Sequence, residues 1–353
     1  MMSMLNSDQE QNVASGGVAV QAKGDITITT GLSYSDARTI ALDVFNANFY
    51  KLADSAAKLA VERAEEITDK FLSKLQSEAP ARLVEAQDPD FQYALLTVQK
   101  EYARTGDKDL GDLLVDLLVD RSKYEKREIL QIVLNEALNT APKLTESQMA
   151  VLALIFLFKY TQNYAVGNHD QLGVFLDRHA SPFISKVVKN QACYQHLEFC
   201  GCGSISIAQI KLETVLGKTY QGLFLKGFDR SEIANSDISM GLDRNFFINC
   251  LNEPSKLQVN ALNMDGLDQK IKEGSISPKD RDKITRLFET GKMSDEEIKE
   301  KCTLIRPYMS DLFESWSASS MQNLTLTSVG IAIGHANIKR YVGEFADLSI
   351  WIN

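Results

Sequence analysis

The stretch "VAVQAKGDITITTGLSYSDARTIALDVFNANFYKLADSAAKLAVERAEEITDKFLSKL", residues 18–75, changes from a strand pattern to a helix pattern at one glycine, Gly31. Before that glycine, apolar residues alternate with polar ones on both sides of a "KGD" turn, which predicts a short β-hairpin. The apolar residues of this pattern are Val18, Val20, Ile26 and Ile28. A two-stranded hairpin alone is marginal in water, so we expect residues 1–31 to pack on another surface, most simply on copies of the same chain.

After the glycine, residues 32–79 contain neither glycine nor proline, and apolar or small residues recur every three or four positions. Ser33 is the expected N-cap, with Asp36 three residues later. One continuous helix would span roughly 60 Å at about 1.5 Å per residue. Such a helix favours packing between chains, as in a coiled coil, whereas two shorter helices folded back on the domain core remain the alternative.

The hairpin and the helix together predict a device for self-association. The residues expected at the oligomer interface are Val18, Val20, Ile26, Ile28, Leu52, Leu59, Ile67 and Phe71.

Residues 80–204 predict a helical bundle whose helices are joined by short connections and therefore pack roughly antiparallel. The run Met149–Phe158 is apolar on all sides, which places it at the bundle centre. Ten residues are too few to cross a bilayer, which takes about 20, so membrane insertion is the disfavoured interpretation.

Residues 205–353 predict a mixed α/β part. Its last segment indicates a strand at "LTLT", a helix with its N-cap near Thr327, and a terminal strand over 348–352. The order of these pieces is similar to that of winged-helix modules, interrupted here by more than 100 residues. The predicted fold is mainly α: a β-hairpin prefix, a long helix, a helical bundle and a mixed, winged-helix-like C-terminal part.

The composition is that of an ordinary globular protein, with 44% hydrophobic and 24% charged residues. A net charge of −9 repels polyanions on average, so we expect a protein partner rather than nucleic acid. Five cysteines without a framework spacing, and no secretory signal pattern at the N-terminus, indicate a cytoplasmic protein.

One cluster of residues has the chemistry of a metal site. Cys193, His196, Cys200 and Cys202 put four soft donors within ten residues, which is the ligand set that zinc takes. Zinc sites usually join two separated ligand pairs, so buried cysteines in a helix before a "GCG" turn are the favoured alternative.

No catalytic motif stands out. None of the four histidines lies in a nucleophile motif, and the "GKT" at 217–219 lacks the first glycine of a phosphate-binding loop because Leu212 occupies that position. We therefore expect no catalytic residues, and no cofactor apart from the zinc alternative.

Two segments carry a resemblance. "GDITITTGLSYSDARTIALDVFNANFYKLADSAAKLAVERAEEITDKFL" and "LTLTSVGIAIGHANIKRYVGEFADLSIWI", about a quarter of the chain, resemble an uncharacterised family of bacterial proteins associated with genomic islands and phage defence. The resemblance implies a bacterial cytosolic protein and transfers no catalytic residue.

The expected function is that of a non-enzymatic, homo-oligomeric interaction or sensor protein in bacterial antiviral defence. The alternatives are an effector with a hidden catalytic or zinc site near Cys193 to Cys202, and a membrane-acting effector that uses the Met149 helix.

Overall fold

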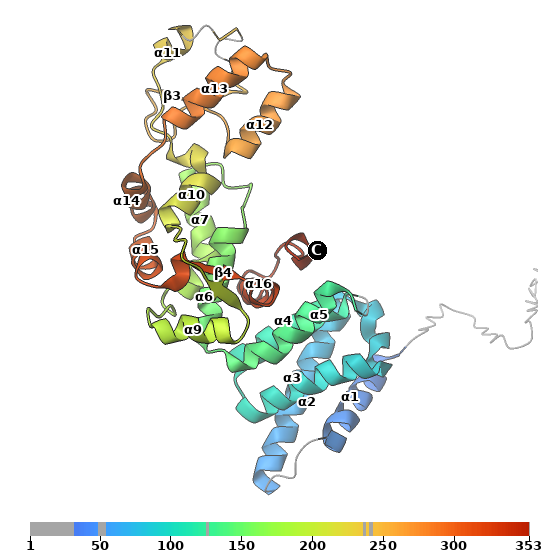
Figure 1. The fold of residues 1–353 in the computed structure, drawn as a ribbon. Helices are drawn as coiled ribbons and strands as arrows, with labels where there is room; N and C mark the ends of the chain where they lie inside the picture. Colours follow the sequence, from blue (N-terminus) through green and yellow to red (C-terminus); the bar gives the residue numbers. More distant parts are fainter. Residues whose placement is uncertain (1–31, 49–53, 125–126, 236–237, 240–242, 353) are drawn as a thin grey trace, which may run out of the picture.

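The computed structural model describes residues 32–48, 54–124, 127–235, 238, 239 and 243–352. The molecule is elongated and mainly helical, with the N-terminal helices at one end and a small α/β lobe at the other (Figure 1). The predicted β-hairpin, with Val18, Val20, Ile26 and Ile28, and the predicted interface residue Leu52 lie outside the described residues.

The first two helices are α1 (Tyr34–Asn48) and α2 (Asp54–Glu78), which pack side by side. Arg38, near the start of α1, pairs with Asp69 in the second half of α2 at 2.6 Å, so the two helices run antiparallel. The sequence left open whether one long helix or two folded-back helices form here, and the structure has the second arrangement. Ser33 and Asp36 form the predicted cap, since each accepts from the other's backbone N–H at 3.2 Å.

Short connections carry the chain through the rest of the N-terminal bundle, as the sequence predicts. Its elements are η1 (Pro80–Gln87), α3 (Pro89–Thr105), α4 (Lys108–Ser122), α5 (Ile129–Thr140) and η2 (Ala141–Lys143). Gly106 ends α3 in the left-handed conformation, with φ 63°, where glycine has no steric penalty.

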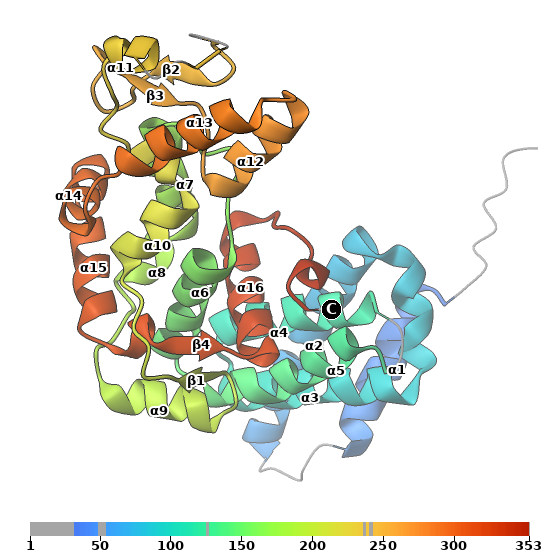
Figure 2. The same ribbon diagram turned by 45° about the horizontal axis from the view of Figure 1, so that its top comes forward.

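Helix α6 (Glu146–Tyr160) lies at the centre of the molecule, and every residue from 148 to 158 is buried. This confirms the prediction that the apolar run is a core helix. Helix α16 (Ser328–Val342) packs closely along it (Figure 2). The contact with α6 is close because Gly334 lies on the shared face, where a Cβ would be 2.8 Å from the Leu152 oxygen. Gly330 approaches another segment, just before β1, and a Cβ there would lie 1.9 Å from the Cys202 oxygen.

Short helices and one strand pair surround α6. In chain order they are α7 (His169–His179), α8 (Ser181–Ile184), α9 (Gln191–Phe199), β1 (Gly203–Ile205), α10 (Leu212–Thr219), η3 (Gln221–Phe224), α14 (Asp295–Ile305), α15 (Met309–Ser317), η4 (Ser320–Gln322) and β4 (Leu324–Leu326). Strands β1 and β4 pair antiparallel, with Ser204 opposite Thr325. The predicted strand at "LTLT" and the helix capped by Thr327 are confirmed, whereas the likeness to winged-helix modules stays a prediction.

Residues 225–292 form what we call the inserted lobe, which has an apolar cluster of its own around Val259, Ile284 and Phe288. Its elements are α11 (Arg230–Asn235), β2 (Phe247–Asn249), β3 (Leu257–Val259), α12 (Met264–Glu273) and α13 (Pro278–Thr290). The chain enters and leaves it through one antiparallel bridge, Leu225 to Lys292. Most of the other buried apolar residues form one large cluster, the main core, which extends from α1 to the C-terminus, and a small third cluster around Phe45 and Ala64 lies between α1, α2 and α3.

The predicted terminal strand over 348–352 is wrong. The segment forms a 3₁₀ turn, η5 (Leu348–Ile350), capped by the Asp347 carboxylate, which accepts from Ser349 N–H at 2.9 Å. Leu348 and Ile352 are buried while Ile350 is 61% exposed, so burial repeats every four residues rather than every two.

Candidate functional site

The predicted metal ligands are only partly brought together. His196 Nε2 lies 3.5 Å from Cys200 Sγ, on the surface of α9. Cys202 is fully buried, and burial raises the pKa of its thiol to about 12. Burial also raises the pKa of Cys193. Across the part of the chain that the structure describes, no group of three or more His, Cys, Asp or Glu side chains is arranged to hold a metal ion.

Gln148 holds the His196 ring in place. Its Oε1 accepts from Thr145 N–H at 2.9 Å, and its Nε2 donates to the Cys193 carbonyl at 2.9 Å, so the amide has one orientation. His196 Nδ1 lies 2.9 Å from Gln148 Nε2 and 3.3 Å from Gln148 Oε1, so the amide can serve this nitrogen as donor or as acceptor. The other ring nitrogen, Nε2, faces the Cys200 sulfur.

The other three histidines bind backbone carbonyls. His169 bonds to the Leu223 oxygen, His179 to the Phe175 oxygen and His335 to the Ala346 oxygen, at 2.9, 3.0 and 2.7 Å. Burial lowers the pKa of each. These contacts assign the three rings to structural positions.

The predicted interface residues Ile67, Phe71 and Leu59, in α2, differ in how far they are exposed. Ile67 and Phe71 are 1% and 0% exposed, and they pack in the main core of their own chain. They do not form an outer surface, because α2 buries this face against the chain's own helices, so for these two residues the assignment to an interface is wrong. Leu59 is 46% exposed.

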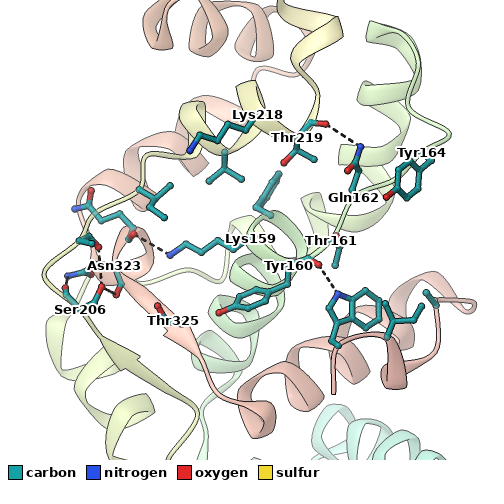
Figure 3. Close-up of a pocket in the computed structure, with 18 residues that line it drawn as sticks. Lys159, Tyr160, Thr161, Gln162, Tyr164, Ser206, Lys218, Thr219, Asn323 and Thr325 are labelled. Atoms are coloured by element: carbon teal, nitrogen blue, oxygen red, sulfur yellow. Dashed lines mark hydrogen bonds between the residues drawn. The ribbon is translucent and has the colours of Figure 1, made fainter. Parts of the chain in front are cut away.

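A cavity at the end of α6 is a different site, which no sequence motif indicated. Its volume is about 890 Å³. The walls come from the end of α6 and the following loop, the segment 206–210, the second half of α10, the segment 322–325 and the C-terminal segment 346–351 (Figure 3). It thus brings together parts of the chain that are almost 200 residues apart.

Lys159 and Tyr160, at the end of α6, complete the outer edge of β4. Lys159 Nζ donates to the carbonyls of Leu324, Met321 and Gln322 at 3.0, 2.8 and 3.2 Å. The Tyr160 hydroxyl accepts from Leu326 N–H at 2.8 Å. The two side chains thereby satisfy backbone groups that a third strand would otherwise pair.

The charge on Lys159 is set by two opposing effects. Burial lowers the pKa of this lysine to about 8. Three carbonyl acceptors call for three N–H donors, which only the ammonium has, and the ring of Trp316 lies 5.3 Å from Nζ. Lys159 is thus a cation at neutral pH, and its donors are fully used within the protein.

Other polar groups at the cavity keep unused hydrogen-bonding capacity. Among the described residues, Lys218 has no hydrogen-bond or ion-pair partner, and the O–H hydrogen of Tyr160 has no acceptor. Figure 3 shows Tyr160 pointing toward Thr325 across the cavity. Asn323 Oδ1 is buried without a partner, while its Nδ2 donates to the Ser206 carbonyl at 2.9 Å.

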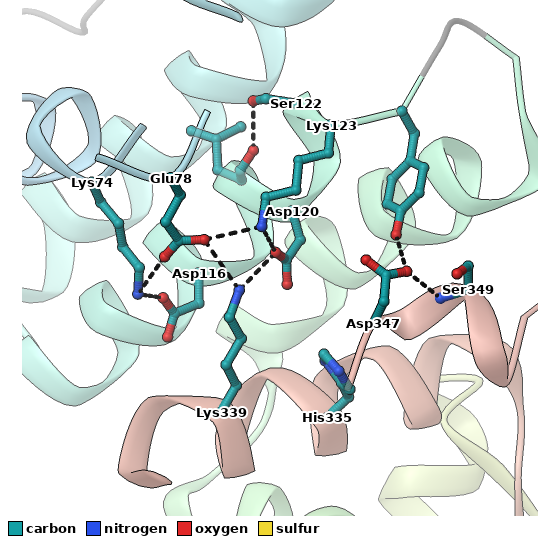
Figure 4. A network of polar contacts seen from close by, with 12 residues as sticks. Lys74, Glu78, Asp116, Asp120, Ser122, Lys123, His335, Lys339, Asp347 and Ser349 are labelled. Atoms are coloured by element: carbon teal, nitrogen blue, oxygen red, sulfur yellow. Dashed lines mark hydrogen bonds and ion pairs between the residues drawn. The ribbon is translucent and has the colours of Figure 1, made fainter. Parts of the chain in front are cut away.

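A network of ion pairs lies where α16 meets α2 and α4 (Figure 4). Lys339 Nζ is 2.8 Å from Asp120 and 3.4 Å from Glu78, and Lys123 contacts the same two carboxylates at 2.8 and 3.0 Å. Burial raises the pKa of Asp120, but the two ammonium groups outweigh it and the net pKa is lowered. The network ties α16 to α2 and α4, so its role is to hold the C-terminal helix on the N-terminal bundle.

Sequence reasoning missed the residues of the cavity, although two signals were present. Lys159 directly follows an apolar run of ten residues, where a lysine must find buried partners. Lys218 belongs to the "GKT" that was set aside as a phosphate-binding loop, and in the structure it ends α10 beside the cavity.

No helix in the described ranges is both long and apolar enough to span a bilayer.

Comparison with known proteins identifies a family, and its description states no activity. A family model described as ":-like" matches residues 31–352. Searches of curated proteins and of solved structures returned no match. Because the family model covers far more than half of the chain, the protein belongs to this ":-like" family.

Proposed function

We propose that this protein is a non-enzymatic, ligand-responsive interaction protein, and that the cavity beside Lys159, Tyr160 and Lys218 is its ligand site. The observation that carries the proposal is the cavity itself, with about 890 Å³ of space and polar groups whose hydrogen-bonding capacity is not used within the chain. This volume lies in the usual range of ligand pockets, about 300–1,000 Å³. The carbonyl contacts of His169, His179 and His335, with the raised pKa values of Cys193 and Cys202, support binding rather than catalysis.

Ligand binding here can influence the whole molecule. The cavity walls include the C-terminal segment, whose Trp351 donates to the Tyr160 carbonyl at 2.7 Å, and they include α10, which precedes the inserted lobe. A ligand that draws these walls together changes how the C-terminal segment and α10, which are far apart in the sequence, are positioned relative to each other. This is the property expected of a sensor.

A cavity-filling variant tests the ligand site. Ala208 lines the cavity and is exposed, so Ala208→Trp occupies space without replacing a core residue. In a thermal-shift screen of small molecules, compounds that stabilise the unmodified protein should lose their effect on this variant. Compounds that stabilise both proteins equally would show that the cavity is not the binding site.

Self-association is the second element of the proposal. It rests on the strand pattern of residues 1–31 and on the partly exposed Leu59, and we propose a protein rather than a nucleic acid as the further partner because the net charge is −9. Removal of residues 1–31 should lower the mass measured by light scattering while the helical circular dichroism persists. An unchanged mass contradicts this element.

The proposed setting is antiviral defence in the bacterial cytoplasm, which rests on the resemblance of the two ends of the chain to proteins with that association. Cells that express the protein should form fewer plaques on phage challenge than cells that express Ala208→Trp. Equal plaque counts at equal expression contradict the setting.

A second candidate function, a zinc-dependent effector, is favoured by one observation, the 3.5 Å contact between His196 and Cys200. Metal analysis of the purified protein tests it, with Cys200→Ser as the matched variant. Zinc at one equivalent that is lost in the variant supports this candidate, and zinc at background level in both rejects it.

A further inference from the structure

We propose that the ligand of the cavity is a small organic anion with an apolar or aromatic body, and that its anionic group binds at Lys218. This inference rests on the proposed function, in which the same cavity is the ligand site. Three properties of the cavity support an anion with an apolar body: its walls, its charge and its free hydrogen-bond donors.

The walls suit an apolar body. The side chains of Phe158, Ile210, Val215, Ile350 and Trp351 line the cavity, and Ile350 and Ile210 are 61% and 45% exposed. Covering apolar surface that is open to water is favourable, so an apolar ligand body gains free energy by binding against these walls.

The charge of the cavity excludes cations. The chain has 47 acidic residues, yet none of the described residues that line the cavity is an aspartate or a glutamate. The two charged side chains that do line it are Lys159 and Lys218. A cationic ligand would meet only like charge, whereas an anion would meet an ammonium.

Both lysines also lie in the last turns of helices, where they offset the negative ends of the helix dipoles. The terminal carbonyls there are already bonded: Trp351 Nε1 donates to the Tyr160 oxygen, and Gln162 Nε2 donates to the Thr219 oxygen at 3.3 Å. Lys159 uses its three donors on backbone carbonyls. The ammonium of Lys218 is therefore the positive charge left for a ligand.

Neutral donors complete the site. The Tyr160 hydroxyl accepts from Leu326 and keeps its own hydrogen to donate, and burial raises the pKa of this phenol so that it stays protonated. The hydroxyl of Thr325 is exposed at the same wall. An anion at Lys218 thus has hydrogen-bond donors on the facing side of the cavity.

Two dyes that share one aromatic frame test the inference. The probe 8-anilinonaphthalene-1-sulfonate is an aromatic anion, and N-phenyl-1-naphthylamine is the same frame without the sulfonate. Fluorescence titrations of the full chain with each dye separate the contribution of the charge from that of the apolar body. Circular dichroism and the melting temperature verify that every variant is folded.

Lys218→Glu should weaken binding of the sulfonate dye about 10-fold or more and change binding of the neutral dye less than about 2-fold, since a charge-assisted contact is reversed. Ala208→Trp should weaken both dyes. Lys58→Glu, at an exposed lysine of α2 away from the cavity, is the matched control and should change neither.

The outcomes test the ligand site and the preference for an anion separately. If Ala208→Trp weakens both dyes but Lys218→Glu affects them equally or not at all, the cavity is a ligand site and the preference for an anion is wrong. If Ala208→Trp leaves both dyes bound as before, the proposed ligand site itself is wrong.

Discussion

The main core and the inserted lobe are attached to their surroundings by different kinds of contact. Within the main core, α16 lies so close to its neighbours that a methyl group does not fit at Gly330, and buried ion pairs tie it to α2 and α4. The lobe encloses its own apolar cluster and meets the main core at a seam where Gly222 N–H donates to the Leu262 carbonyl at 2.8 Å and a Cβ on Gly222 would lie 2.0 Å from the Ala261 oxygen. Gln221 donates to the Phe288 carbonyl at 2.8 Å, and Gln258 donates to the Gly222 carbonyl at 2.9 Å.

This difference indicates two levels of cooperativity. Close backbone packing and buried charges are lost together, so elements of the main core should unfold as one unit. The lobe has an apolar cluster separate from that of the main core, so it should open locally at lower cost. Both tryptophans, Trp316 and Trp351, lie outside the lobe, and their fluorescence therefore reports on the main core.

The largest effect is expected for Gly330→Ala. The added Cβ would lie 1.9 Å from the Cys202 oxygen, which is backbone and cannot move aside alone. We expect a loss of about 3 kcal/mol or more in the free energy of unfolding, measured by urea denaturation with tryptophan fluorescence. Gly167→Ala, also outside the lobe, is the control, because the nearest atom to its added Cβ is 3.4 Å away on the Gln171 side chain. Equal stability of both variants would mean that α16 is not held closely.

The next effect is expected for Lys339→Ala. Asp120 keeps Lys123 as a partner but loses one of two ammonium groups in a site where its side chain is 8% exposed. We expect a loss of about 2 kcal/mol in the free energy of unfolding. The double variant with Asp120→Asn should recover part of that loss, since the buried charge is then absent. If Lys339→Ala is no worse than Lys58→Ala, the network does not hold α16.

Acid should destabilise the main core through His335. Burial lowers the pKa of this histidine in the folded state, and Asp120, Asp347 and Lys339 are the charged groups near it. As the pH falls below about 6.5, the unfolded chain binds the proton first, so the contribution of His335 to stability falls by at most about 1.4 kcal/mol per pH unit. Denaturation between pH 7.5 and 5.5, chosen as about one unit either side of that value, measures this slope. In His335→Gln the slope should be smaller, and an identical slope assigns it to another group.

The smallest effect is expected for Gln221→Ala, and it should be confined to the lobe. The variant removes one buried amide contact, worth about 1 kcal/mol. Hydrogen exchange should become faster in peptides from 246–260 and stay the same in peptides from α6. Gln92→Ala, which removes a similar bond to the Ala86 carbonyl inside the N-terminal bundle, is the control. Faster exchange in both regions would show that the lobe and the main core are one cooperative unit.

Local patterns predicted much of the fold. The caps at Ser33 and Thr327 form as expected, because a cap depends on residues within one turn of each other. The mainly α class and the buried α6 followed from composition and periodicity. The terminal strand failed because a five-residue alternation is too short to distinguish a strand from a 3₁₀ turn anchored by Trp351 and Asp347.

The candidate site was much less accessible to sequence reasoning. The cavity joins Lys159, Lys218 and Thr325, which are far apart in the chain and share no motif. The zinc hypothesis, by contrast, grew from residues close in sequence, and the structure places them at different depths, with Cys202 buried and Cys193 and Cys200 half-buried. Closeness along the chain does not determine which side chains converge.

By itself, the sequence determined where helices begin and end, which helix is buried and that the fold is mainly α. Those features follow from hydrogen bonds and apolar spacing within a few residues. Only the tertiary structure decided that the segment 32–79 folds back on itself, that α16 lies against α6, and that a cavity opens between α6, α10 and the C-terminal segment. These outcomes depend on which distant surfaces fit each other, and that fit is a property of packed side chains rather than of local pattern.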